Sequence, residues 1–498
     1  MPLRSLLLVA AALVAGGCAP ALTAASSTPA GQAAIERAVQ SALVRAGLAS
    51  PTASPLPTAE AEAPALHAGP MLADVTHRGA AVWVLTSPGS EVVVDAFGPD
   101  SLEAGGTMLA ASGRTTSGPD GTATVRLFGL EPGTTYDVTV TVDGVDVTPT
   151  SYATRVETQP LWQWRTDPPA FTAAIGSCYY DNDPAYDRPG DAYGGSPSIF
   201  GEIAALDPDL MLWLGDNVYL REVDWWDAAG IDYRYRHSRS EPALQPLLAR
   251  AAHYAIWDDH DYGPNDSDRS YVLKDEALET FSDYWPAAAR GLPGVPGVFT
   301  HFQWADVEFF MLDDRYHRAP NDAPDAERQI LGPEQAQWLL DALTTSQAPF
   351  KIVAVGGQFL NPLPVFETFA AIAPRERRTL LDQIAARRIE GVVFLSGDRH
   401  HTELLKMDRP GAYPLYEFTS SPLTAGASTY PLRGDSPEYT NPLRVDGTLV
   451  AGEHNFGTLT VTGPRTDRVL TMRTYKADGA LLWEHAVRAR NLTVPGGE

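Results

Sequence analysis

The sequence predicts an α/β domain over residues 158–498, preceded by an all-β domain over residues 67–157. From Pro160 onward, short apolar runs that suit buried strands alternate with segments of helical periodicity. Before that point, apolar and polar residues alternate along short segments that end in turn signals, as in half-buried strands. A chain of 498 residues is long enough for a large core and for more than one domain.

The N-terminal segment is predicted to direct export. Residues 1–18 contain Arg4 and then an apolar stretch that is too short to span a bilayer. Small residues before Cys18 resemble a bacterial lipobox, in which that cysteine is lipidated, and an ordinary cleaved signal peptide is the alternative. We therefore expect a periplasmic or cell-surface lipoprotein, or otherwise a secreted protein. Residues 19–66 are rich in Ala, Pro, Ser and Thr, which is typical of a linker.

The charge balance limits the partners. The chain has 37 Lys and Arg against 62 Asp and Glu, a formal net charge of −25. Binding of nucleic acid or of an anionic membrane through bulk charge is therefore not expected, and membrane contact would depend on a lipid anchor. Because this charge repels phosphorylated substrates at long range, phosphate chemistry would need local positive charge. We expect a monomer that acts on a small molecule.

The all-β domain shows strand and turn signals but no ionisable cluster. Alternation is clear in Val82–Val84 and in Val138–Val142, and turns are expected at Asp120-Gly121 and Asp143-Gly144. The segment that ends at Tyr136 resembles the tyrosine corner of fibronectin type III and immunoglobulin-like sandwiches, whose tyrosine hydroxyl bonds back to the chain. A structural or shielding role is predicted for this domain.

The α/β domain contains several apolar runs that are expected to form strands: Phe171–Cys178, Leu210–Leu214, Tyr254–Trp257, Val307–Leu312, Lys351–Val355, Val392–Leu395 and Leu415–Phe418. Helices are expected at Pro333–Leu343, where proline suits the first helical position, and at Arg375–Arg388. Further strands are expected to complete the sheets at their edges: Gly457–Thr462, Val469–Arg473 and Leu481–His485.

Three acidic motifs directly follow three of these runs. They are Gly215-Asp216, Asp258-Asp-His-Asp261 and Gly397-Asp-Arg-His-His401. Loops at the carboxyl ends of buried strands are where α/β sheets place their sites. Carboxylates and imidazoles that converge from three strands cannot share a pocket without a compensating charge, which metal cations usually supply. The sequence therefore predicts a two-metal hydrolase.

Three residues are predicted to bind metal near the first motif. Asp216 follows a glycine, which lets its carboxylate approach crowded backbone and bridge two cations. Cys178 has no disulfide partner if Cys18 is lipidated, and an unpaired thiol in an oxidising compartment is normally buried or ligated. Tyr219, as a phenolate, would suit a hard trivalent ion such as Fe³⁺. Each residue alone also has an ordinary structural explanation: a turn, a buried cysteine and a packed aromatic.

The other two motifs supply the remaining candidates. We assign Asp259 to metal binding and His260 to proton donation or to stabilisation of the leaving oxygen. Asp398 and His400 are predicted to be ligands, because residues two apart on an extended segment face the same side. His401 would then face away from the site, toward its rim.

Arg315 ends a further apolar run and is a candidate phosphate clamp. A guanidinium binds phosphate oxygens through two parallel hydrogen bonds. The alternative for Arg315 is a surface salt bridge.

Taken together, six motifs in order resemble the alkaline phosphatase D (PhoD-like) group of calcineurin-like metallophosphatases. The resemblance covers roughly residues 67–490. The motifs are Gly176-Ser-Cys178, Gly215-Asp-Asn-Val-Tyr219, Trp257-Asp-Asp-His-Asp261, Leu312-Asp-Asp-Arg315, Leu331-Gly-Pro-Glu-Gln-Ala-Gln-Trp-Leu339 and Ser396-Gly-Asp-Arg-His400.

This resemblance implies a four-layer αββα fold after the β-sandwich. It implies an iron(III) site formed by Cys178, Asp216 and Tyr219, with Asp398 or its neighbours close by. It also implies a site for Ca²⁺ or another divalent cation near Asp216, Asp259 and His400. Gln358 departs from broader relatives, which have a histidine in the corresponding segment.

The predicted activity is hydrolysis of phosphate monoesters, diesters or both by attack of a metal-bound hydroxide, with His260 assisting the departing alkoxide. A phospholipase D-like phosphodiesterase is the alternative with the same machinery. An alternative of another class is a surface binding protein whose enzyme domain has lost activity.

Overall fold

The computed structural model describes residues 63–99 and 105–495. The predicted signal segment, Cys18 and nearly all of the predicted linker lie outside these residues. Residues from Pro64 to the C-terminus belong to one compact unit. Within the described residues, no helix combines the length and the apolar character that crossing a bilayer requires.

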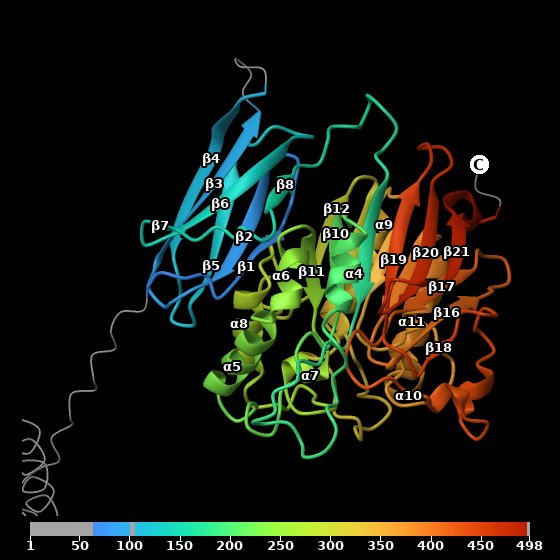
Figure 1. The fold of residues 1–498 in the computed structure, drawn as a ribbon. Helices are drawn as coiled ribbons and strands as arrows, with labels where there is room; N and C mark the ends of the chain where they lie inside the picture. The colour runs from blue at the N-terminus through green and yellow to red at the C-terminus, as the bar shows by residue number, and fades with distance from the viewer. Residues whose placement is uncertain (1–62, 100–104, 496–498) are drawn as a thin grey trace, which may run out of the picture. The chain divides into compact units, whose positions relative to one another are not determined.

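The described residues form two large sheets and one smaller sheet (Figure 1). The first large sheet has, in order, β21 (Leu481–Arg488), β20 (Val469–Lys476), β19 (Asn455–Thr462), β9 (Phe171–Gly176), β10 (Leu210–Leu214), β11 (Ala252–Ile256), β1 (Ala68–Ala73), β2 (Gly79–Leu85) and β5 (Thr122–Phe128). The second has β12 (Thr300–Trp304), β13 (Val307–Met311), β14 (Lys351–Ala354), β15 (Val392–Ser396), β17 (Leu415–Thr419), β16 (His401–Met407) and β18 (Val450–Ala451).

The smaller sheet contains β4 (Thr107–Thr116), β3 (Glu91–Pro99), β6 (Thr135–Val142) and β7 (Val145–Asp146), with β8 (Arg155–Glu157) paired to β6. The α-helices of the described residues are α4 (Ile199–Ala205), α5 (Ala228–Arg239), α6 (Gln245–Leu248), α7 (Asp259–Tyr262), α8 (Lys274–Tyr284), α9 (Pro333–Thr345), α10 (Phe369–Ile372) and α11 (Pro374–Ala386). Short 3₁₀ helices are η1 (Pro242–Leu244), η2 (Tyr430–Leu432), η3 (Pro437–Thr440) and η4 (Ala489–Leu492).

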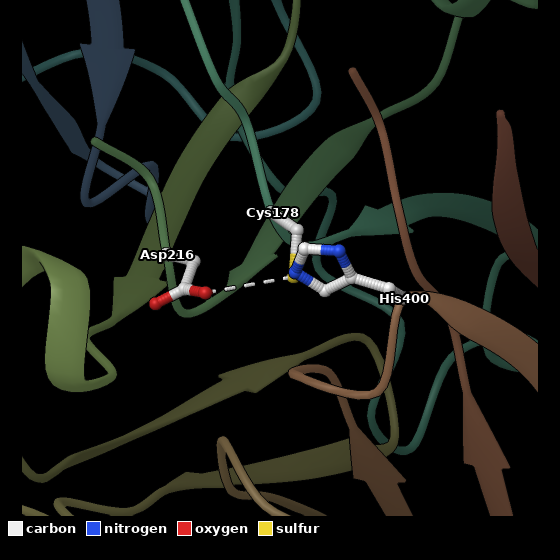
Figure 2. Close-up of side chains that lie close together, drawn as sticks. All are labelled: Cys178, Asp216 and His400. Carbon is white, nitrogen blue, oxygen red and sulfur yellow. Dashed lines mark hydrogen bonds between the residues drawn. The ribbon is translucent and has the colours of Figure 1, made fainter. Parts of the chain in front are cut away.

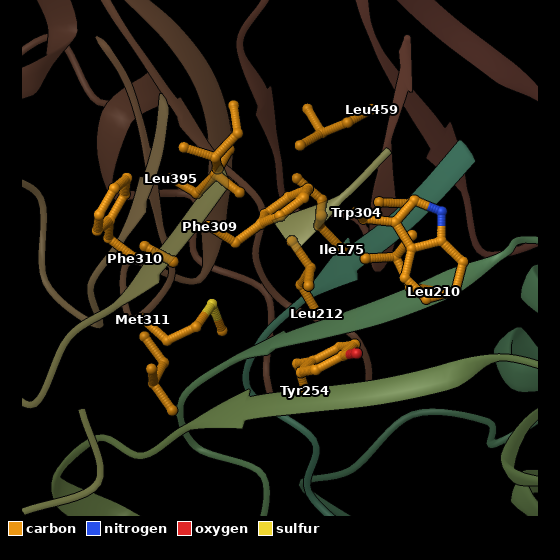
Figure 3. Close-up of a cluster of buried hydrophobic side chains, with 14 of the residues drawn as sticks. Ile175, Leu210, Leu212, Tyr254, Trp304, Phe309, Phe310, Met311, Leu395 and Leu459 are labelled. Carbon is orange, nitrogen blue, oxygen red and sulfur yellow. The ribbon is translucent and has the colours of Figure 1, made fainter. Parts of the chain in front are cut away.

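Strand β10 shows why the sheets stack. It lies between two parallel neighbours, β9 and β11, and all five of its residues are buried. Leu210, Leu212 and Leu214 point into the core between the two large sheets, where Figure 3 shows Leu210 and Leu212 beside residues of the second sheet. Met211 and Trp213 point the other way, into a second core formed with α4, α6 and α8. A strand that is buried on both faces has a continuous run of apolar residues in its sequence.

Helices cover the outer face of each large sheet. Helices α9 and α11 add leucines and isoleucines to the core of the second sheet, among them Leu339, Leu343, Leu380 and Ile384. Helix, sheet, sheet and helix therefore form four layers, which is the predicted αββα class. The strands that lead to the site are parallel within each sheet, so their carboxyl ends lie at one edge.

The N-terminal β region is joined to the first large sheet. Strand β1 pairs in parallel with β11, with Leu72 opposite Ala252. Strands β1, β2 and β5 thus extend that sheet, while β3, β4 and β6 form the sheet that packs on them. The hydroxyl of Tyr136 accepts a hydrogen bond of 2.7 Å from the backbone N–H of Glu131, which is the tyrosine-corner contact. The division at residues 157 and 158 stays a prediction.

Most predicted elements agree with the structure to within a few residues. At the site, the expected strand through Cys178 ends at Gly176 and the expected strand through Trp257 ends at Ile256, and elsewhere β20 and β21 each continue three residues beyond their expected ends. Cys178 lies in the left-handed region with φ 61°, which a strand residue does not adopt. Strand β19 is also internal, because it pairs with both β9 and β20, whereas an edge position was expected.

We predict that His253 makes stability depend on pH. Nδ1 of His253 accepts from Nε1 of Trp213 (3.0 Å), and Nε2 therefore donates to the carbonyl of Leu247 (3.0 Å). Burial lowers the pKa of this imidazole to about 3. The unfolded chain takes up the proton near pH 6.5, so the stability that the neutral imidazole contributes is complete above that pH and is lost as pH falls toward 3.

His253→Gln should therefore flatten the fall of the unfolding free energy between pH 6.5 and 4 by about 1.4 kcal/mol per pH unit. Urea unfolding at a series of pH values measures this slope. His67→Gln, at an exposed position, is the control. An unchanged slope in His253→Gln would contradict the assignment.

Candidate metal centre

The ends of four strands meet at one edge of the two large sheets. Gly215, after β10, has φ +92°, and a Cβ there would lie 2.7 Å from the Cβ of Asp258, after β11. A Cβ on Gly397, after β15, would lie 2.6 Å from the Leu214 carbonyl oxygen and 2.6 Å from the Cβ of Ser177, after β9. Glycine is needed at both positions because the loops touch there.

Cys178, Asp216 and His400 form the first group of donors, shown in Figure 2. Each offers one ligand atom, and these atoms lie within 4.8 Å of one another. The Cys178 thiol donates to Oδ2 of Asp216 at 3.7 Å. All three residues have positive φ, of 61°, 52° and 53°, which turns their side chains out of the strand direction. Predicted ligands from three different strand ends are thus brought together.

Tyr219 lies against this first group. Its hydroxyl is 3.1 Å from Nε2 of His400. Nδ1 of His400 lies 2.6 Å from the carbonyl oxygen of Gly426, which can only accept, so Nδ1 carries the hydrogen. The lone pair of Nε2 is therefore available to bind a cation together with the other ligand atoms of the first group. The ring of Tyr219 also packs 4.3 Å, centroid to centroid, from the ring of His260.

Asp216, Asp259 and His260 form a second group, again with ligand atoms within 4.8 Å of one another. Asp216 belongs to both groups, so one carboxylate has the position that a bridge between two cations requires. Nδ1 of His260 is buried and has no hydrogen-bond partner among the described residues. His260 was predicted to donate a proton or to stabilise the leaving oxygen, and its position also suits a ligand.

The neighbouring aspartates hold the backbone. Asp258 and Asp261 form a capping box around α7, in which the Asp261 carboxylate accepts from the N–H of Asp258 (2.9 Å). Asp261 also accepts from the N–H of Asn217 (2.9 Å). Its bonds therefore fix the two loops relative to each other rather than the ring of His260.

The backbone conformation that brings Asp398 and His400 to the site differs from the expected one. Their φ values are 61° and 53°, so the segment is a left-handed turn and not an extended strand. The prediction that Asp398 and His400 face the same side because they are two apart on an extended segment was therefore wrong. Asp398 is absent from every three-donor group found among the described residues, and one of its oxygens lies 3.8 Å from Nη1 of Arg399.

A third group contains Asp259, Asp266 and Glu367, with ligand atoms within 4.8 Å of one another. Glu367 was not predicted from the sequence, and Asp266 was expected only to form the loop and to support the ligands from behind. Glu367 lies in an irregular loop before α10, with no strand signal and no acidic neighbour in sequence. Only the folded chain brings it to the strand ends.

Arg315 requires a correction. Its side chain is 0% exposed, so it is not a surface salt bridge, and it is not free to clamp a phosphate. Nε donates to Asp258 at 2.5 Å, Nη2 donates to Glu367 at 2.6 Å, and Nη2 also pairs with Asp258. Arg318 pairs with the other oxygen of Glu367 at 2.9 Å. Arg315 neutralises buried carboxylates instead.

Gln358 and His401 also have structural roles, within the second sheet. Nε2 of Gln358 donates to Glu403 (2.9 Å) and to Thr419 (2.9 Å) inside the second sheet. His401 was expected at the rim but is buried, with Nε2 3.6 Å from Glu403. Gln358 therefore secures the sheet beneath the site, and His401 belongs to strand β16.

The electrostatics of the site fit bound cations. Burial, together with the nearby Cys178 and Asp259, raises the pKa of Asp216 well above its usual range. Burial raises the pKa of the Cys178 thiol to about 11. A cation would reverse both effects by stabilising the ionised forms. The carboxylate, thiol and imidazole donors and the unpartnered Nδ1 of His260 suit metal ions.

We predict that Arg315→Met destabilises the protein by roughly 3–5 kcal/mol, because it leaves Asp258 and Glu367 buried without their counter-charge. Urea unfolding at a fixed metal concentration measures this loss. Arg126→Met is the matched control, because Arg126 pairs with Asp74 at 2.9 Å but is 38% exposed. Its loss should stay at or below about 1 kcal/mol. Equal losses in the two variants would contradict the role given to Arg315.

Comparisons with known proteins agree with this architecture. Alkaline phosphatase D of Bacillus subtilis (strain 168) is 25% identical over 374 residues, which cover 62% of this chain and 61% of that relative. The solved structure of PhoD has a TM-score of 0.67 at 18% identity and covers 86% of this chain and 92% of its own. Purple acid phosphatase PPD1 from yellow lupin has a TM-score of 0.60 at 13% identity, with 86% and 77% covered. Both structures share the fold.

Two family models match the chain. A domain of unknown function matches residues 63–160. The model of the PhoD-like phosphatases matches residues 185–462, which carry the loops after β10, β11 and β15. The chain belongs to the PhoD-like phosphatase family.

Proposed function

We propose that this protein is an exported, metal-dependent phosphoesterase that hydrolyses phosphate monoesters, diesters or both. The observation that carries the proposal is the position of Asp216, which belongs to two donor groups at once. A carboxylate shared by two cation sites is the arrangement expected for two-metal hydrolysis. Membership of a phosphatase family supports the same reaction class. The assembly of the predicted donors argues against a binding protein that has lost its activity.

The residues proposed to hold Fe³⁺ are Cys178, Asp216 and Tyr219, with His400 beside them. Those proposed to hold Ca²⁺ or another divalent cation are Asp216 and Asp259, with His260 beside them. When bound, the cations would neutralise phosphoryl oxygens and lower the pKa of coordinated water. The Tyr219 phenol supports the trivalent assignment, because phenolate oxygen is a hard ligand.

The protein's own residues position these groups before substrate arrives. The carbonyl of Gly426 fixes the His400 ring by accepting from Nδ1. The Tyr219 ring packs against His260 and limits its rotation. We propose that His260 protonates the departing alkoxide oxygen; burial lowers the pKa of its imidazole, and the neighbouring Asp259 opposes that shift by favouring the protonated form.

Export is proposed from the sequence of residues 1–18, which lie outside the described residues. The pattern before Cys18 supports a lipid anchor on the cell surface or in the periplasm. The substrate would then be a phosphate ester outside the cytoplasm.

We predict that Asp216→Asn lowers kcat for nitrophenyl phosphate and its bis-ester by several orders of magnitude, because one substitution disturbs both cation sites. Elemental analysis should show reduced metal content in the same variant. Asp341→Asn, on the exposed side of α9, is the control. The unsubstituted protein should contain iron and absorb visible light through the Tyr219 phenolate. Full activity in Asp216→Asn would rule out the two-metal mechanism, and iron-free protein would exclude the Fe³⁺ assignment.

We predict that His260→Asn affects poor leaving groups most. Hydrolysis of an alkyl phosphate should fall by roughly 10²–10⁴-fold, because an alkoxide needs a proton as it departs. Hydrolysis of nitrophenyl phosphate should fall much less, because nitrophenolate leaves without one. Metal content, measured in parallel, separates the two roles. Loss of metal with equal effects on both substrates would make His260 a ligand instead of a proton donor.

A further inference from the structure

A pocket of about 610 Å³ opens directly beside two of the predicted metal-centre residues. Its lining includes Asp398 and His400 and residues of the loop before α10, of η2 and of η3: Pro364, Phe366, Tyr430 and Pro437. This volume is typical of pockets for small molecules. An ester substituent on a phosphorus atom held at the donor groups would extend into this space.

The charges in the pocket exclude an anionic substituent. Arg399 is the arginine among the lining residues, and its Nη2 donates to Glu438 at 2.8 Å. Nη1 lies 3.8 Å from Asp398 and donates to the carbonyl of Phe366 at 2.5 Å. Nη1 and Nη2 are thus held by a carbonyl and a carboxylate, while Nε is buried and has no hydrogen-bond partner among the described residues. A second phosphate or a carboxylate on the substrate would face Asp398 and Glu438 there. The guanidinium of Arg433, 5.7 Å from the centroid of the Tyr430 ring, is paired with Asp435.

The pocket walls present aromatic surface instead. Phe366 is 47% exposed and Tyr430 is 38% exposed, and both line the pocket. The bond from Arg399 to the Phe366 carbonyl holds that loop against the site. Pro364 and Pro437 add rigid apolar surface. Exposed aromatic rings in a pocket are the usual platforms on which a planar ring stacks.

We propose that this pocket binds the retained ester substituent of a phosphodiester when that substituent carries a planar, uncharged aromatic ring, as a nucleoside does. The inference rests on the proposed function and names the substrate class for the same site. In the reaction, water supplies the new P–O bond and a proton, the bond to the leaving oxygen breaks, and that oxygen departs with the bonding electrons. The retained substituent stays on phosphorus and stacks on Phe366 and Tyr430.

The test compares esters that share one leaving group. The p-nitrophenyl ester of thymidine 5′-phosphate, methyl p-nitrophenyl phosphate and p-nitrophenyl phosphorylcholine all release p-nitrophenolate. We expect the unsubstituted protein to prefer the thymidine ester over the methyl ester in kcat/KM by roughly tenfold or more, as stacking of one base allows. The double variant Phe366→Ala/Tyr430→Ala should bring this ratio close to one, and Phe366→Leu and Tyr430→Leu should lower it in part.

The control variant is Leu432→Ala. Leu432 lies on η2 with Tyr430 and is 53% exposed, but it does not line the pocket. The thymidine-to-methyl ratio should be unchanged in this variant. Thermal unfolding checks that all variants fold.

Four outcomes would overturn the proposal. Equal kcat/KM for the thymidine and methyl esters, or a thymidine-to-methyl ratio that is unchanged in the double variant, would rule out stacking in this pocket. The proposed function would be unaffected. Preference for the choline ester would show that the pocket binds a cationic substituent instead of an aromatic ring. Hydrolysis of nitrophenyl phosphate but of none of these three diesters would likewise overturn the proposal, and failure on all four esters would instead refute the proposed function on which the inference rests.

Discussion

The site depends on one electrostatic constraint: several carboxylates lie together in a buried space between the ends of two sheets. Asp216, Asp258, Asp259 and Glu367 all lie here, and burial alone would keep them from ionising. Arg315 compensates the inner part of the cluster by pairing with Asp258 and Glu367. The outer part, centred on Asp216, has donors without a protein cation among the described residues. That division explains why metal ions fit at Asp216 and why Arg315 is not available to substrate.

The stacking of two sheets creates this space. Parallel strands on each sheet end at the same edge, and glycines at 215 and 397 let the loops touch. The chain then leaves each strand through a left-handed residue, at Cys178, Asp216 and Asp398, so the side chains turn into the gap. Such backbone conformations are uncommon outside glycine and concentrate where function requires them. The pocket beside Asp398 and His400 lies next to the donors, so the space proposed for chemistry and the space proposed for the ester substituent adjoin.

Much of the fold could be predicted, because strands buried on both faces leave long apolar runs. Strands β10, β13, β14, β15 and β17 and helices α9 and α11 lie close to their expected positions. Helix α5 was not predicted as a buried element, because it buries Arg234 and Arg239 beside Ile231 and Tyr235. A helix whose buried face contains arginines, one ion-paired and one stacked on tryptophan rings, shows no clear apolar stripe. The join between β1 and β11 was also not predicted, since pairing between distant segments leaves no local signal.

The sequence alone determined which residue types follow each strand, and therefore that donors suited to metal ions would gather at one edge. It could do so because a strand end is a local feature, readable from an apolar run and the polar residue that closes it. The tertiary structure decided the rest: that Arg315 faces inward, that Glu367 and Asp266 join Asp259, that Asp398 belongs to none of the three donor groups among the described residues, and that Phe366 and Tyr430 line one pocket. These relations join segments far apart in the chain, and only the packing of the two sheets and their loops sets the distances between them.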